Sequence, residues 1–147
     1  MKKFLFLFGS IFVFSIITAC GSKKELQERA PAQFQDVYYT NSENGINLHI
    51  PVAVIQDKRV SLDSVYFRGM RSSLVQDSEQ KNLYTAAFNT ADGMKIMSSD
   101  PAEESKNTPP QKPQKAPFKI ADDEAVLVFK EEGKTNYYKL TGIEEQN

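Results

Sequence analysis

The side chains that could carry out chemistry are few in this chain of 147 residues. It has a single cysteine, Cys20, and a single histidine, His49. A zinc site needs about four ligands, drawn mainly from these two residue types, so the composition argues against one. A hydrolase needs a base beside its nucleophile, and Ser98-Ser99-Asp100 lacks the flanking glycines of a nucleophile elbow. No catalytic residue, metal or cofactor is predicted.

The position of Cys20 suggests a different chemistry. A charge-free apolar stretch, residues 4–19, follows Lys2 and Lys3 and ends at this cysteine. A basic start, an apolar run and small residues at its end are typical of a secretory signal peptide. The run is shorter than the about 20 apolar residues that a spanning helix needs, so we expect it to be removed.

The residues before the cysteine, Ile17-Thr18-Ala19-Cys20, resemble the bacterial lipobox. That resemblance implies cleavage after Ala19 and attachment of a diacylglyceryl group to the Cys20 sulfur. One acyl chain binds a membrane only reversibly, whereas two or three hold a protein stably. The alternative is a buried cysteine that merely ends an apolar helix. Lipidation at Cys20 accounts better for its position and for the lack of a disulfide partner.

Charge argues against a nucleic-acid partner. The whole chain has a formal net charge of −1, and removal of Lys2 and Lys3 with the signal peptide changes this by −2, to −3. Nucleic-acid binders carry a basic patch or stripe, which this composition does not predict. The expected partners are the membrane, through the lipid on Cys20, and a second protein of the cell envelope.

The chain is expected to divide into a signal peptide (1–19), a lipidated cysteine with a flexible tether (20–36) and one β-rich domain (37–147). Residues 21–36 are polar, mixed in charge and interrupted by Pro31. Fully extended, they would reach at most about 55 Å. A short helix over residues 24–29 is the alternative, although isolated helices under about 12 residues are marginal in water.

The domain shows a repeat of two residues rather than a helical one. In INLHI, residues 46–50, the apolar side chains alternate with Asn47 and His49, which predicts a half-buried strand with His49 on its less apolar side. Further strands are expected at 64–69, 83–90, 94–99, 125–130 and 135–143. Hairpin turns are expected at Asp92-Gly93 and at residues 131–134. We therefore predict an all-β fold of six to eight strands, a single antiparallel β-sandwich or small barrel.

A proline-rich stretch at residues 100–117 interrupts this pattern and holds five of the seven prolines. Proline lacks a backbone donor and excludes a central strand. The stretch predicts a long exposed crossover between strands. An alternative is an extended segment, around Pro110–Pro113, that a partner domain binds.

Two further patterns leave alternatives open. The acidic cluster Asp122-Asp123-Glu124 lacks the spacing and glycine of a calcium loop and is typical of a solvated turn. Its carboxylates could still serve a glycan-acting enzyme of the envelope, because such pairs are recognised by their separation in space. The aromatic residues fit core and cross-strand packing, with an exposed carbohydrate-binding row as the alternative. They are Tyr38, Tyr39, Tyr66, Phe67, Tyr84, Phe88, Phe118, Phe129, Tyr137 and Tyr138.

Four stretches, GINLHIPV, DSVYFRG, IMSSDP and DDEAVLVFKEEGKTNYYKLTGI, resemble segments of small uncharacterised lipoproteins of flavobacteria and related Bacteroidota. The resemblance covers residues 37–143. It implies a Gram-negative host and, with Gly21 after the cysteine, an outer-membrane location. Surface export in this group goes with an acidic run after the cysteine, where only Glu25 stands, so we expect the domain to face the periplasm. The expected function is a lipid-anchored envelope lipoprotein with a non-catalytic binding or structural role.

Overall fold

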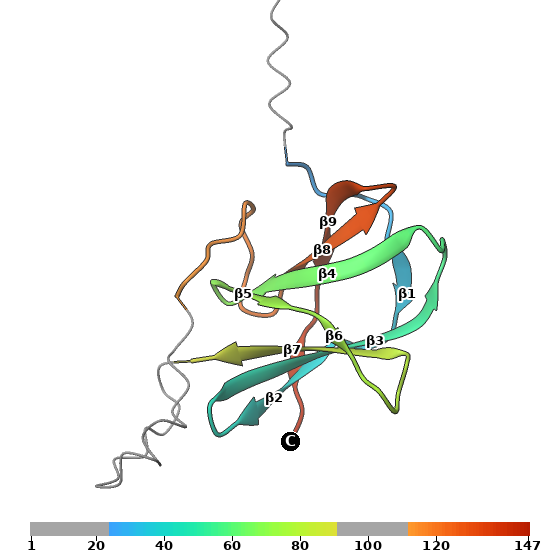
Figure 1. Cartoon of the computed structure of the whole chain (residues 1–147). Helices are drawn as coiled ribbons and strands as arrows, with labels where there is room; N and C mark the ends of the chain where they lie inside the picture. Colours follow the sequence, from blue (N-terminus) through green and yellow to red (C-terminus); the bar gives the residue numbers. More distant parts are fainter. Residues whose placement is uncertain (1–23, 91–111) are drawn as a thin grey trace, which may run out of the picture.

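The computed structural model describes residues 24–90 and 112–147 (Figure 1). Within these two ranges the chain forms strands and no helix. The strands are β1 (Ala32–Phe34), β2 (Tyr38–Ser42), β3 (Gly45–Ile55), β4 (Val60–Phe67), β5 (Met70–Ser73), β6 (Val75–Gln76), β7 (Leu83–Asn89), β8 (Ala125–Glu131), β9 (Lys134–Leu140) and β10 (Glu144–Glu145).

The strands form two sheets that pack face to face. One sheet has the order β10-β2-β3-β7-β6, and β1 pairs with the second half of β3. The other has the order β5-β4-β8-β9 and lies above the first in Figure 1. All strand pairs are antiparallel except β10 with β2. The all-β prediction is confirmed, and the sheets do not close into a barrel.

The core lies between the two sheets and follows from strand alternation. Leu48 and Ile50 of β3 are fully buried, while His49 between them is only half-buried, as predicted. Phe67 of β4 extends from the opposite sheet. Its ring centroid lies 6.0 Å from that of Phe88 of β7, in a tilted arrangement favourable for aromatic pairs. The apolar run at 125–130 is the central strand β8, which lies between β4 and β9.

The predicted hairpin at 131–134 is confirmed. Glu132 and Gly133 both have positive φ, 51° and 79°, and join β8 to β9. A two-residue turn of this kind matches the right-handed twist of the flanking strands. Arg68 and Gly69 make a second turn of the same kind, with φ of 47° and 76°, between β4 and β5. This second hairpin was not predicted from the sequence. The turn and strand expected over 92–99 lie outside the described residues.

The domain begins earlier than residue 37. β1 lies inside the stretch that the sequence assigns to the tether, and Ala32 is 1% exposed within the core. Upstream of it, Leu26 forms a parallel bridge with Tyr137 of β9, and Gln27 donates its N–H to the Tyr137 carbonyl at 2.7 Å. The number of strands also exceeds the expected six to eight. Strands of two or three residues, such as β1, β6 and β10, are too short to show a period.

The end of the proline-rich stretch rests on the four-stranded sheet. The N–H of Gln114 donates to the Gly69 carbonyl at 2.9 Å, and the Phe118 ring packs edge-on against Tyr137 at 5.4 Å. Ala116, Phe118 and Ile120 are half-buried, and the residues between them are exposed. These residues therefore form part of the crossover from β7 to β8. Residues 100–111 of the stretch lie outside the described residues.

Candidate functional site

A small pocket lies where three parts of the chain meet. They are the N-terminal segment 27–31, the corner between β3 and β4, and the end of β8. The pocket has a volume of about 210 Å³. Its apolar floor includes Val60 and Phe129, which are 8% and 2% exposed. The lining residues are Gln27, Arg29, Ala30, Pro31, Gln56, Asp57, Val60, Phe129 and Glu131.

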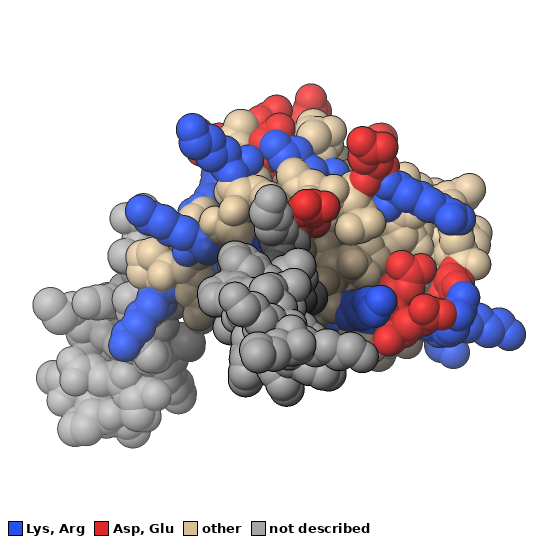
Figure 2. Space-filling view, turned by 90° about the horizontal axis from the view of Figure 1, so that it is seen from above, with Lys and Arg blue, Asp and Glu red and all other residues tan. Residues whose placement is uncertain are grey.

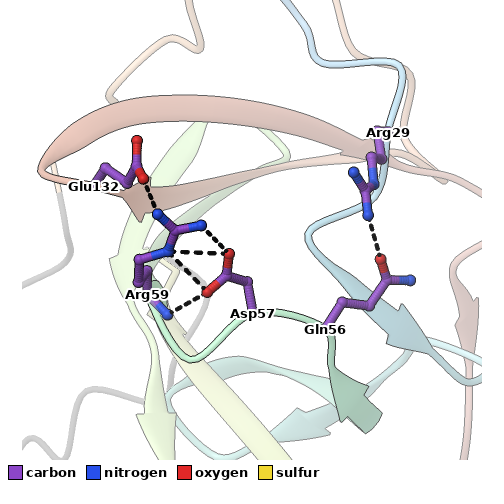
Figure 3. A network of polar contacts seen from close by, with 5 residues as sticks. All are labelled: Arg29, Gln56, Asp57, Arg59 and Glu132. Atoms are coloured by element: carbon purple, nitrogen blue, oxygen red, sulfur yellow. Dashed lines mark hydrogen bonds and ion pairs between the residues drawn. The ribbon is translucent and has the colours of Figure 1, made fainter.

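One side of this corner is fixed by a charge network around Arg59 (Figure 3). The Arg59 guanidinium donates to Asp57, with Nη2 at 2.8 Å from Oδ2, and also to the Glu132 carboxylate. The backbone N–H of Arg59 donates to Asp57 Oδ1 at 2.9 Å, which closes a tight turn between β3 and β4. The side-chain hydrogen bond from Arg59 lowers the pKa of Asp57 below its ordinary value. Asp57 is therefore an ionised, paired carboxylate at neutral pH.

Arg29 lies on the other side of the corner and is less engaged. Its Nη2 donates to Gln56 Oε1 at 3.2 Å (Figure 3). Within residues 24–90 and 112–147 no acidic side chain forms an ion pair with it. A guanidinium has five N–H donors in a planar fork, so Arg29 retains donors for an anionic oxygen. The pocket thus combines an apolar floor, the paired carboxylate of Asp57, the carboxylate of Glu131 and a cation with unused hydrogen-bonding capacity.

This set of groups favours binding over catalysis. A general acid near neutral pH needs a carboxyl pKa raised by burial or by a like charge. The pKa of Asp57 is lowered, and Arg59 occupies both of its oxygens. The arrangement is suited to holding a small charged group.

The acidic cluster before β8 lies elsewhere and forms a turn. Glu124 accepts the Ala121 N–H at 2.9 Å and a hydrogen bond from Lys139 Nζ at 3.0 Å. The Ala121 hydrogen bond and then the Lys139 contact lower the pKa of Glu124. Asp122 and Asp123 are exposed, and their backbone carbonyls accept from Arg68 and Ile143. The structure does not bring these three carboxylates to the pocket.

His49 lies in a row across the outer face of the larger sheet. Thr40 Oγ1 is 3.0 Å from its Nε2, and Thr85 Oγ1 is 3.3 Å from its Nδ1. The ring of Tyr38 stacks on it with centroids 4.8 Å apart. Burial lowers the pKa of His49, which favours the neutral imidazole. Two hydroxyls and an aromatic ring contact this side chain, and none of the described carboxylates forms a hydrogen bond with it, so we assign it to cross-strand packing.

The aromatic side chains mostly face one another. Tyr39 packs on Phe67 at 5.8 Å, and Phe34 stacks on Tyr138 at 5.9 Å. The Arg68 guanidinium lies 4.5 Å from the Tyr39 ring centroid. These pairings support the packing interpretation of the aromatic residues over a row of rings open to a sugar.

Neither the pocket nor the charge network beside it was predicted from the sequence. Arg59 and Glu132 are 73 residues apart, and Arg29 and Gln56 are 27 apart, so no local motif connects them. One usable signal was the run Asp57-Lys58-Arg59 between two apolar stretches. An aspartate side chain commonly accepts the backbone N–H two residues later, and this hydrogen bond favours a turn. Cys20, Ser98 and Asp100 lie outside the described residues.

The described part of the chain has neither a metal-binding cluster nor a membrane-spanning helix. It contains no group of three or more histidine, cysteine, aspartate or glutamate side chains that could hold a metal ion. It also contains no helix of the length and apolarity needed to cross a membrane. Comparison with known proteins found no matching protein-family model, curated protein or solved structure.

Proposed function

We propose that this chain is a lipid-anchored protein of the cell envelope, held by lipid on Cys20, with a non-catalytic binding or structural role. The outer membrane is its proposed location, with the domain facing the periplasm. The proposal rests first on the N-terminal pattern of two lysines, an apolar run and Ile17-Thr18-Ala19-Cys20. One structural observation carries it further, the attachment of the chain to the domain at Leu26.

The attachment point supports a short anchor. The bridge of Leu26 to Tyr137 and the Gln27 hydrogen bond fix the chain six residues after Cys20. Six residues span at most about 20 Å, because each extended residue covers about 3.5 Å. The connection between Cys20 and the domain is therefore shorter than the about 55 Å that a tether ending at residue 36 would allow. A domain on so short a connection would stay beside the bilayer, as expected of a protein that works at a membrane surface.

The non-catalytic role is supported by the state of the described carboxylates. The pKa values of Asp57, Asp63, Asp77 and Glu124 are all lowered. For Asp63 burial alone would raise the pKa, but hydrogen bonds from Ser64 and Lys130 and the nearby cations outweigh it. None of these four groups is poised as a general acid. None of these four groups therefore supports the glycan-acting enzyme.

The lipid anchor is tested on the wild-type chain expressed in a Gram-negative host. The membrane fraction should contain the protein, and mass spectrometry of its N-terminal peptide should show acyl mass on Cys20. Cys20→Ala should abolish both. An unmodified wild-type protein in the soluble fraction would refute the anchor.

The binding role is tested by crosslinking in the native envelope, followed by identification of the captured partner. Turnover assays on peptidoglycan and polysaccharides cover the enzymatic alternative. Wild-type turnover that is lost when Asp122, Asp123 or Glu124 is changed to its amide would favour the enzymatic function over the binding role. Absence of any crosslinked partner would remove the main support for a binding role.

A further inference from the structure

The attachment of the chain at Leu26 determines which end of the domain lies toward the membrane. We call this the anchor end and define it as the N-terminal segment 24–31, the β3–β4 corner 56–59 and the β8–β9 turn 131–134. In Figure 1 the described chain begins on the upper side near β9, whereas the C-terminus and the β2–β3 turn lie on the lower side. A connection of at most about 20 Å cannot reach around the domain from this end.

The charges at the anchor end suit a membrane surface of mixed charge. Figure 2 views the domain from above and shows lysine, arginine and acidic side chains interspersed across this side. Arg59 forms ion pairs with both Asp57 and Glu132, which hold the corner and the turn together. The anchor end is therefore neither an acidic face that phospholipid would repel nor a basic patch that would bind any polyanion.

The pocket at this end offers one cation, Arg29, to an anionic ligand, and its lining also includes the carboxylates of Asp57, which pairs with Arg59, and of Glu131. Arg29 comes three residues after Leu26, so it is held close to the point where the chain joins the domain. Its guanidinium has a single hydrogen bond, to Gln56, and no ion pair with any of the described acidic side chains. Arginine binds phosphate oxygens through two parallel N–H donors, which makes phosphate a suitable ligand for this position.

We propose that the anchor end contacts the bilayer that holds Cys20 and that Arg29 binds the phosphate of a lipid headgroup at the pocket. The proposal rests on the proposed lipid anchor and adds to it an orientation and a lipid contact. The headgroup layer on each side of a bilayer is about 5–8 Å thick. A connection of about 20 Å therefore lets Arg29 reach it without leaving its place in the corner.

The orientation is tested with the full-length lipidated chain in phospholipid vesicles. A fluorophore is attached at Lys58→Cys in the β3–β4 corner or at Asn44→Cys in the β2–β3 turn, because both positions are exposed and lie outside the pocket. The vesicles contain lipids with a quencher on the headgroup. Quenching should be strong at residue 58 and weak at residue 44. Equal quenching at the two positions, or stronger quenching at residue 44, would overturn the orientation.

The phosphate contact is tested in the Lys58→Cys background. Arg29→Gln removes the cation and should lower the quenching at residue 58, although the short connection keeps it above the level seen at residue 44, whereas Arg29→Lys retains the charge and should keep most of the wild-type quenching. Arg68→Gln, on the turn between β4 and β5, is the matched control and should leave the quenching unchanged. Unchanged quenching in Arg29→Gln would overturn the contact.

Failure of this inference can be told apart from failure of the lipid anchor. Loss of wild-type membrane retention, or absence of acyl mass on Cys20, would refute the anchor and the inference together. A retained, acylated protein with the wrong quenching profile would refute the inference alone.

Discussion

Tyr39 and Glu145 are 106 residues apart in the chain, and the Tyr39 hydroxyl donates to Glu145 Oε2 at 3.2 Å. The other oxygen of Glu145 accepts a hydrogen bond from the Asn41 side chain. These bonds attach β10 to β2, alongside the parallel pairing of their backbones. Tyr39 is 8% exposed and also accepts from Arg68 at 3.1 Å. The last strand of the chain is thus fastened to the second by one carboxylate.

Glu145→Ala should destabilise the domain by about 1 kcal/mol, because it removes hydrogen bonds to a partly buried hydroxyl. Glu144→Ala is the matched control, since Glu144 is exposed and no side-chain hydrogen bond is found for it among the described residues. Urea denaturation measures both variants against the wild type. Equal stabilities of the two variants would show that the Glu145 side chain does not hold β10.

Gly45 and Gly133 should respond differently to substitution by alanine. A Cβ at Gly45 would overlap the Phe88 carbonyl oxygen, and the φ of Gly45 is +151°. A Cβ at Gly133 would meet no atom within 4 Å, so only the unfavourable φ of +79° opposes it. Gly133→Ala should therefore cost about 1–2 kcal/mol, the penalty for the left-handed region.

Gly45→Ala should cost clearly more, because β3 and β7 must separate to admit the methyl group. Urea midpoints compare the two glycine variants. A smaller loss of stability for Gly45→Ala than for Gly133→Ala would contradict the close approach of the Phe88 carbonyl to β3.

The contrast between β3 and the short strands shows what the sequence can predict. Leu48, His49 and Ile50 alternate because one face of β3 is buried, and β8 is continuously apolar because both of its faces are covered. Such patterns are local and can be read from one stretch. β1 and β10 acquire their structure only from β3 and β2, which lie far away in sequence. The Arg59 network has the same origin, because its partner Glu132 comes from another hairpin.

His49 makes stability depend on pH in a defined direction. Burial lowers its pKa in the folded state below the ordinary value of 6.5. The unfolded state therefore binds more protons between the two pKa values, and stability falls as the pH drops through that interval. The contribution of neutral His49 to the free energy of unfolding is fully present above pH 6.5 and is lost as the pH falls through the folded-state pKa.

Urea midpoints at pH 7.5 and pH 5.5 should therefore differ more in the wild type than in His49→Gln. Because His49 is the only histidine, its imidazole resonances also report the folded-state pKa directly by nuclear magnetic resonance. A measured pKa above 6.5, or identical pH dependence in His49→Gln, would contradict the effect of burial.

Two parts of the connection between β7 and β8 should differ in their importance for folding. Residues 112–120 are tied to the sheet by Gln114 and Phe118. Phe118→Ala removes the ring that packs on Tyr137 and should destabilise the domain by about 1–3 kcal/mol, less than the truncation of a fully buried phenylalanine.

Deletion of residues 102–111 leaves these contacts in place and should keep the urea midpoint near that of the wild type. If the deleted part is also a partner contact, its crosslinks in the envelope should disappear while the fold persists. A deletion variant that fails to fold would show that these residues are structural and would remove them as a candidate partner contact.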